Sequence, residues 1–120
     1  VGRVNDDGES YFLDADPIQQ GAVLVDYALE EGFVVEGTNV AILRGMDGTF
    51  HSEGRTEGFV TGLEAAGANI IDNQTGNWST SEALPIVESW LISNPEIEAI
   101  FACNDDMALG AIQAMEAAQR

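Results

Sequence analysis

The chain has 120 residues, of which 45% are hydrophobic, so it is long enough for one domain with a single core. It carries 21 acidic residues against four arginines and no lysine, for a net charge of −17. This balance excludes a surface for nucleic acid or for anionic membranes, because both need cationic side chains to neutralise phosphate. We interpret the acidic excess as adaptation to high salt, with an ordinary acidic protein that lacks lysine as the alternative.

Strands and helices are predicted in alternation from the start of the chain. A short apolar run at residues 11–13 predicts a first strand. Asp16 and Pro17 are typical of a helix N-cap and first helical position, and Gly32 is typical of a helix end. The apolar face of this helix is predicted to comprise Ile18, Ala22, Val25, Ala28 and Leu29.

The middle of the chain predicts two further strands around one helix. Residues 40–43 are apolar throughout, which is typical of a parallel strand covered on both faces. A loop with two glycines follows, and then a helix over about residues 52–66, ended by Gly67. Residues 68–72 predict a short strand, and residues 73–79 predict a polar loop.

The last third of the chain repeats the pattern. Ser79 or Thr80 is predicted to cap a helix that ends at Asn94. A fourth strand over residues 98–102 runs directly into a helix over residues 105–118. The predicted core positions on the three later helices are Phe59, Leu63, Ala66, Ala83, Ile86, Val87, Trp90, Leu91, Met107, Ala111 and Met115.

Four strand–helix units predict an α/β fold, a three-layer α/β/α Rossmann-like arrangement with a parallel sheet. Right-handed crossovers then place helices on both faces of the sheet. The predicted sheet has three or four strands, with an apolar edge strand that a further strand would normally cover. We therefore expect one lobe of something larger, and the exposed edge also allows a homodimer.

Polar side chains follow each core strand, and the loops that carry them share one end of a parallel sheet, where ligands of such sheets bind. An amide, a guanidinium fork and an indole face together suit a neutral polyhydroxylated ligand. The candidates are Thr49, His51, Glu53 and Arg55 in the first loop, Asn77 and Trp78 in the second, and Asn104, Asp105 and Asp106 in the third.

Each candidate also has an ordinary structural explanation. Trp78 could close a loop over the core, and Arg55 could pair with an acidic neighbour on its own helix, Glu53 or Glu57. Asn104 is expected to cap the last helix whatever else it does, and His51 could be an incidental loop residue. The convergence of three loops at one sheet end nevertheless favours a binding site.

Enzyme and metal chemistry find little support in the residues. Asp105 and Asp106 are adjacent, so on a helix they point about 100° apart and make a poor catalytic pair. Cys103 is the single cysteine, and its place at the end of an apolar run predicts a buried structural thiol. One cysteine and one histidine cannot form a common zinc site, and the absence of lysine excludes a phosphate-binding P-loop. We expect no enzyme activity, no cofactor and no metal.

Several segments resemble one family. Residues 99–111, which read Ala-Ile-Phe-Ala-Cys-Asn-Asp-Asp-Met-Ala-Leu-Gly-Ala, resemble the Asn-Asp-x-Met-Ala-x-Gly signature of periplasmic sugar-binding proteins of ABC transporters. These are the ribose, galactose/glucose and xylose type, and the sensor domains of LacI/GalR repressors share the signature. Residues 55–59 resemble the family's Arg-x-x-Gly-Phe helix start, and residues 75–78 resemble its aromatic loop.

The resemblance implies a type I periplasmic-binding-protein-like lobe over residues 1–120. It would form most of the C-terminal lobe of a two-lobed clamp that closes on a sugar, with the N-terminal lobe and the last strands outside this sequence. In the family, the residues that match Arg55, Trp78 and Asn104 bind the sugar by hydrogen bonds and ring stacking. Thr49 and His51 stand where the glucose/galactose type has His and Asp, which is a departure from that type.

The implied function is a solute-binding receptor that captures a monosaccharide for an ABC importer. Its partners would be the sugar and the membrane permease, and this lobe would bind no nucleic acid. Its location would be periplasmic or extracellular, with a lipoprotein anchor as one option. The alternative is the effector-sensing domain of a LacI/GalR-type regulator.

Overall fold

The computed structural model describes residues 16–118, so the strand predicted at residues 11–13 lies outside the described part of the chain. Within this range helices and strands alternate, as the sequence predicts. In chain order the elements are α1 (Pro17–Glu30), β1 (Asn39–Arg44), α2 (Phe50–Ala65), β2 (Asn69–Thr75), α3 (Thr80–Ser93), β3 (Ala99–Ala102) and α4 (Asp105–Ala117).

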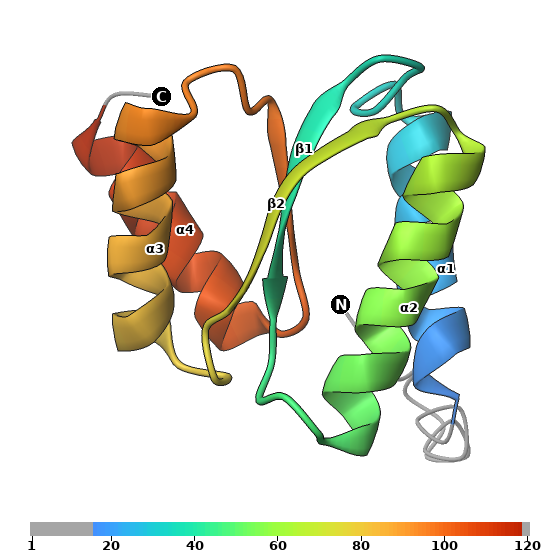
Figure 1. The fold of residues 1–120 in the computed structure, drawn as a ribbon, viewed down its shortest axis with the longest axis horizontal. Helices are drawn as coiled ribbons and strands as arrows, with labels where there is room; N and C mark the ends of the chain where they lie inside the picture. The colour runs from blue at the N-terminus through green and yellow to red at the C-terminus, as the bar shows by residue number, and fades with distance from the viewer. Residues whose placement is uncertain (1–15, 119–120) are drawn as a thin grey trace.

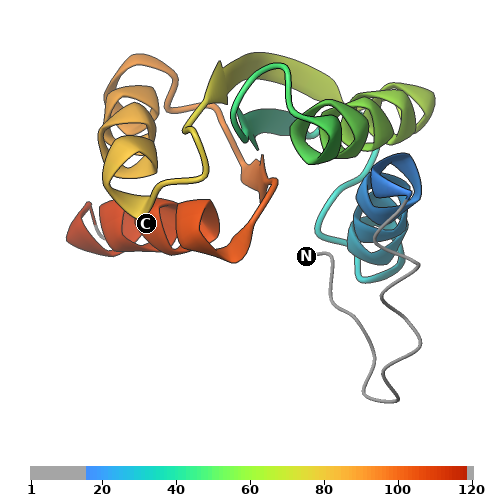
Figure 2. The same cartoon turned by 90° about the horizontal axis from the view of Figure 1, so that it is seen from below.

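The described strands form one parallel sheet in the order β2-β1-β3. Helices α1 and α2 cover one face, and α3 and α4 cover the other (Figure 1, Figure 2), so the predicted three-layer α/β/α arrangement is confirmed. Residues 40–43 of the central strand are fully buried. Their unbroken apolar run follows from that position, because a central strand between two helical layers has no solvent-facing side.

Polar caps and glycines set the helix limits. Asp16 Oδ1 accepts a hydrogen bond from the Gln19 N–H at 3.1 Å, and Ser79, rather than Thr80, caps α3. Gly32 follows α1 with φ of +79° and Gly67 follows α2 with φ of +81°. Both glycines adopt the left-handed backbone that ends many helices, because they carry no Cβ.

Two predicted limits and one core position are wrong. Helix α2 starts at Phe50 rather than at about residue 52, because Thr49 already adopts the extended N-cap backbone. Strand β2 continues to Thr75 rather than ending at residue 72, because its pairing with β1 persists as far as Arg44 opposite Thr75. Ile18, predicted on the apolar face of α1, is 44% exposed.

Glycines bring α1 and α2 into close contact. A Cβ added to Gly58 would lie 2.3 Å from the Ile18 carbonyl oxygen, and one added to Gly21 would lie 2.3 Å from the Arg55 carbonyl oxygen. The two backbones therefore touch at positions where only glycine fits. This contact places the Gln20 side chain beside the Arg55 guanidinium.

Candidate functional site

The three strands end together, and the loops that follow them meet at this end of the sheet. These loops are residues 45–49 after β1, residues 76–79 after β2, and residues 103–104 after β3. Helices α2, α3 and α4 start directly after them, so their backbone N–H groups also point toward this end. The sequence prediction of a shared loop cluster is thus met by the topology.

The loop that carries Trp78 has an unusual backbone. Asn77 and Trp78 both have positive φ, +52° and +64°, a conformation that non-glycine residues seldom adopt. Side chains hold it in place: Thr75 Oγ1 donates to the Gly45 carbonyl at 2.5 Å and accepts from the Asn77 N–H at 3.2 Å. Asn77 Nδ2 donates to Glu82 at 2.8 Å. Backbone strain maintained by several contacts is typical of binding sites.

The Trp78 ring packs closely against Gly45. A Cβ built on Gly45 would lie 2.3–2.5 Å from three atoms of the six-membered ring, so only a glycine leaves room for the indole. Trp78 is half-buried and also contacts the hydrophobic core. The bulk of the indole therefore supports the loop as the structural explanation predicted, while part of its surface stays accessible at the sheet end.

Asn104 has two hydrogen-bonding roles. Its Oδ1 accepts from the Met107 N–H at 2.9 Å, which confirms the predicted cap of α4. Its Nδ2 donates to the Trp78 carbonyl at 3.3 Å. The amide thus joins the loop after β3 to the loop after β2 and fixes the two candidate residues relative to each other.

The structural explanation predicted that Arg55 pairs with Glu53 or Glu57 on its own helix, but Arg55 has other partners. Its Nε donates to Gln20 Oε1 at 2.9 Å and its Nη1 donates to the Cys103 carbonyl at 2.7 Å. The guanidinium is half-buried between α1, α2 and the end of β3. The structure therefore brings Arg55 next to Asn104, in contact with the residue before it.

Arg44 and Asp47 shape the loop after β1. Arg44 Nε donates to Asp47 Oδ1 at 2.9 Å, and its Nη1 donates to both the backbone carbonyl and the side chain of Asn73 at 2.7 Å. The hydrogen bond from Arg44 lowers the pKa of the Asp47 carboxyl below its ordinary value. The pair is exposed, so it orders the loop more than it stabilises the fold.

Thr49 and His51 interact with their immediate neighbours rather than with the other candidate residues. The Thr49 hydroxyl donates to the Met46 carbonyl at 2.6 Å and so belongs to the turn before α2. His51 is exposed, and its ring lies edge-on to Phe50 with the ring centres 5.4 Å apart. Among the described residues, neither side chain forms a hydrogen bond with Arg55, Trp78 or Asn104.

Cys103 is buried behind the site. Burial raises the pKa of its thiol, and its Sγ lies 3.5 Å from the Thr56 hydroxyl. This agrees with the predicted buried thiol. Within residues 16–118, no three His, Cys, Asp or Glu side chains gather closely enough to hold a metal ion. Over the same residues, no helix is both long enough and apolar enough to cross a bilayer.

Sequence reasoning missed Gly45, Gln20 and Thr75, which support the candidate side chains. Gly45 was visible as the first glycine after an apolar strand, but its partner Trp78 lies 33 positions along the chain. Gln20 lies on the polar side of its helix and carries no motif. Thr75 falls in the segment that the sequence predicts as a loop. These roles depend on contacts between distant segments, which no local pattern reports.

Comparison with known proteins gives a consistent result. The model of one family, described as periplasmic binding protein domain, matches residues 3–120. The D-ribose/D-allose-binding protein of Pseudomonas aeruginosa is 37% identical over 102 residues, which cover 85% of this chain and 32% of that protein. The ribose import binding protein of Escherichia coli is 32% identical over 104 residues, covering 87% and 34%. The chain thus spans about a third of the length of these relatives.

Solved structures agree on the fold. An ABC transporter periplasmic solute-binding protein from Actinobacillus succinogenes with bound D-allose superimposes with a TM-score of 0.79 and is 36% identical, covering 87% of this chain and 36% of that one. A solute-binding protein from Burkholderia multivorans gives a TM-score of 0.81 at 28% identity, covering 87% and 36%. The fold is that of a type I periplasmic binding protein, and a LacI/GalR-type effector domain is not the favoured interpretation.

Proposed function

Because the chain belongs to the periplasmic binding protein family, we propose that it is part of a receptor that captures a monosaccharide for an ABC importer. The family consists of binding proteins, and we propose that this chain likewise has no enzyme activity. The observation that carries the proposal is the joining of Trp78, Asn104 and Arg55 at the carboxyl end of the sheet.

The chemistry of these groups suits a neutral sugar. The accessible part of the Trp78 indole offers an apolar face for the C–H groups of a sugar ring. The Asn104 amide offers both a donor and an acceptor for hydroxyl groups. Arg55 joins the site through its contact with Cys103. Thr49, at the end of the loop after β1, and His51, in the first turn of α2, stay candidate ligand residues beside it. The relatives named for D-ribose and D-allose favour an aldose of five or six carbons.

The test is sugar binding by the full-length protein. Titration with D-ribose, D-allose, D-glucose and D-galactose is expected to change Trp78 emission and to raise the melting temperature for at least one sugar. Trp78→Ala and Asn104→Ala should each weaken that binding at least about tenfold, the size expected for losing one hydrogen bond or stacking contact. Ile92→Ala, at a position 83% exposed on α3, is the control and should bind as the parent does.

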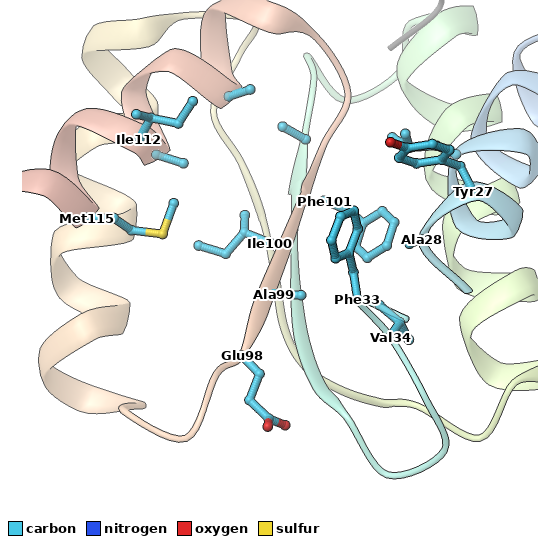
Figure 3. A pocket seen from close by; sticks show the side chains of 14 residues that line it. Tyr27, Ala28, Phe33, Val34, Glu98, Ala99, Ile100, Phe101, Ile112 and Met115 are labelled. Carbon is cyan, nitrogen blue, oxygen red and sulfur yellow. The ribbon is translucent and has the colours of Figure 1, made fainter. Parts of the chain in front are cut away.

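We also propose that the lobe continues with a further strand beside β3. In the described residues β3 pairs with β1 along one edge only. A groove of about 440 Å³ runs along its other edge between α1 and α4 (Figure 3). Its walls are apolar and include Leu24, Tyr27, Phe33, Phe101, Ile112 and Met115.

Crossover handedness supports a strand in this groove. The chain passes from β2 to β3 through α3, and α4 lies on the same face as α3 (Figure 1). A right-handed crossover through α4 would therefore continue in the same direction and place its strand on the open edge of β3. The length of the relatives, about three times that of this chain, agrees with such a continuation into a two-lobed protein.

The rival occupant of the groove is a second copy of the chain. Sedimentation of residues 1–120 and of the full-length protein separates the two. A dimer of the short chain that disappears in the full-length protein supports the strand, because the strand then covers the edge. A full-length dimer broken by Ile112→Asp, a change at a groove position that is 47% exposed on α4, would instead establish the homodimer through this edge.

For the whole protein, we propose a location outside the cytoplasmic membrane, in the periplasm or at the cell surface with a lipid anchor. Its partner there would be the permease of an ABC importer. Fractionation of cells that express the full-length protein tests this location. Retention in the cytoplasm would contradict the importer role and would reopen the regulatory alternative.

Finally, we propose that the acidic surface is an adaptation to high salt. The two described arginines are both bonded within the fold, and Arg44–Asp47 is the ion pair found among residues 16–118. Most carboxylates in this range thus have no cationic neighbour, and added salt should relieve their mutual repulsion. The melting temperature is expected to rise with salt well beyond 0.15 M; a flat or falling curve would count against the proposal.

A further inference from the structure

Strand β2 lies at the outer edge of the sheet. In the part of the chain that the structure describes, it pairs with β1 only, and Figure 2 shows it at the side of the sheet opposite to β3. An edge strand presents a row of unpaired backbone N–H and C=O groups, to which a strand of another molecule can bond. The groups on the open side of β2 therefore decide whether this edge can accept a further strand.

The hydrogen bonds to β1 show which backbone groups of β2 face the open side. The N–H of Gly76, directly after β2, donates to the Arg44 carbonyl at 2.9 Å. Successive residues of a strand direct their backbone groups to opposite sides, so counting back from Gly76 places Thr75 and Asn73 on the open side. A strand added to this edge would have to bond to these two residues.

Side chains of the protein already occupy both backbone groups of Asn73. Its N–H donates to Asp72 Oδ1 at 2.8 Å, and its carbonyl accepts from Arg44 Nη1 at 2.7 Å. Hydrogen bonds that involve a charged partner are about twice as strong as those between neutral groups. The donor and the acceptor that Asn73 would offer to a further strand are therefore taken by Asp72 and Arg44.

The register of β2 is a second obstacle to an added strand. It shifts by one residue between Val40 and Ala41, so β2 contains one extra residue opposite this point. Before the extra residue, the Asn69 N–H donates to the carbonyl just before β1 at 2.8 Å, which places Ile70 on the open side. The open-side positions are thus 70, 73 and 75, whereas the bonding positions of a regular strand recur every two residues.

We infer that Arg44 and Asp72 close the β2 edge to strand addition, and that the strand they exclude is the β2 edge of a second copy of the chain. A copy offers an identical edge, and the net charge of −17 keeps copies apart only at low salt. Once salt screens that repulsion, the side chains at Asn73 are what prevents pairing. The inference does not depend on the proposed sugar binding.

Two substitutions open the edge, and each has a matched control. Arg44→Met frees the Asn73 carbonyl; Asp47→Ala is its control, because it removes the loop partner of Arg44 and leaves the Arg44–Asn73 bonds in place. Asp72→Ala frees the Asn73 N–H; Trp90→Phe is its control, because it removes the indole bond to Asp72 and leaves the Asn73 N–H bonded.

The experiment is sedimentation of the full-length variants over a range of concentrations in about 1 M salt, where the Debye length is about 3 Å. With both Arg44→Met and Asp72→Ala, the protein is expected to self-associate at least about tenfold more tightly than the parent, the effect of one or two freed backbone hydrogen bonds. Asn73→Pro removes an N–H that β1 does not use, so adding it should return the double variant to the behaviour of the parent.

Amide exchange, followed by NMR on the monomeric protein, reports on the edge before any association. Exchange of the Asn73 N–H should be at least about tenfold faster in Asp72→Ala than in the parent, because the acceptor that protects it is gone. Trp90→Phe should leave this exchange rate as it is. Equal rates in Asp72→Ala and the parent would contradict the assignment of Asp72 to the Asn73 N–H.

Three sedimentation results would overturn the inference. One is a folded double variant that stays as monomeric as the parent. Another is equal association of Asp47→Ala or Trp90→Phe, which would make loop order or lost stability the cause. The last is association that survives Asn73→Pro, which would place the contact on another surface, such as the groove beside β3. If the double variant does not fold, each single variant is compared with its own control in the same way.

Discussion

Replacing Gly45 by alanine tests whether the Trp78 ring packs directly against the backbone of the loop after β1. The new Cβ would lie 2.3, 2.4 and 2.5 Å from Cη2, Cζ2 and Cζ3 of the indole. Carbon atoms in contact sit about 3.5–4.0 Å apart, so the ring has to move by about 1 Å or more. Overpacking of this kind costs about 1–3 kcal/mol of unfolding free energy.

The displaced ring also changes the site. Trp78 keeps a left-handed backbone, so its indole has little freedom to adjust without disturbing the loop. We expect Gly45→Ala to lower the free energy of unfolding in urea, to shift Trp78 emission, and to weaken sugar binding by the full-length protein. The emission change is read against the Trp78→Phe variant, which lacks the Trp78 contribution.

A double variant checks the cause. In a Trp78→Ala background, Gly45→Ala should cost less than about 0.5 kcal/mol, because the ring that it meets is absent. A coupling energy of at least about 1 kcal/mol between the two positions is therefore expected. If Gly45→Ala costs the same with and without the indole, or leaves emission and binding unchanged, the packing described for this loop is refuted.

Three further changes have defined outcomes. Gly58→Ala should destabilise the fold by about 1–3 kcal/mol or more in urea unfolding, because its Cβ would lie 2.3 Å from the Ile18 carbonyl oxygen. Gly62→Ala is the control and should cost less, because its Cβ meets only the Val25 side chain at 3.0 Å. The pKa of the Asp72 carboxyl lies below its ordinary value: burial, the largest single influence, raises it, but hydrogen bonds from Gln74, Trp90 and the Asn73 N–H outweigh burial. The ionised carboxylate therefore stabilises the fold above the unfolded pKa of about 3.9, and this contribution is lost as the pH falls through the lower folded pKa. Asp72→Asn should accordingly reduce the acid dependence of the melting temperature below about pH 4. The Cys103 thiol should react with a thiol reagent only as fast as the protein opens, because it is 1% exposed and burial raises its pKa; reaction in the native state at the rate of a free thiol would contradict its placement.

The sequence predicted most of the architecture because the fold depends on local signals. The apolar run at residues 40–43 indicates a strand buried on both faces. The cap residues Asp16, Ser79 and Asn104 indicate where the helices that follow them begin. Both the period of apolar residues and the cap chemistry are short-range properties. Of the two misplaced limits, the end of β2 at Thr75 is set by pairing with β1, whereas the start of α2 at Phe50 follows from the extended backbone of Thr49.

At the site, sequence determined which residues are present and which end of the sheet they share. Strand order and parallel pairing are enough to bring the loops of Thr49, Trp78 and Asn104 together. His51 and Thr49 could not be assigned from sequence alone, because side-chain direction depends on the exact first turn of α2. The partners of Arg55 could not be predicted either, because they are a side chain and a carbonyl on two other elements, far from Arg55 in sequence.

Local chemistry thus determined the elements, the caps and the polar character of one sheet end for this protein. Only the tertiary structure decided that Gly45 packs against the Trp78 indole, that the Arg55 guanidinium donates a hydrogen bond to the Cys103 carbonyl, and that Asn104 joins two loops. The physical reason is range. Secondary structure follows from interactions within a few residues, whereas each of these contacts joins segments 26 to 48 positions apart and exists only once the sheet has formed.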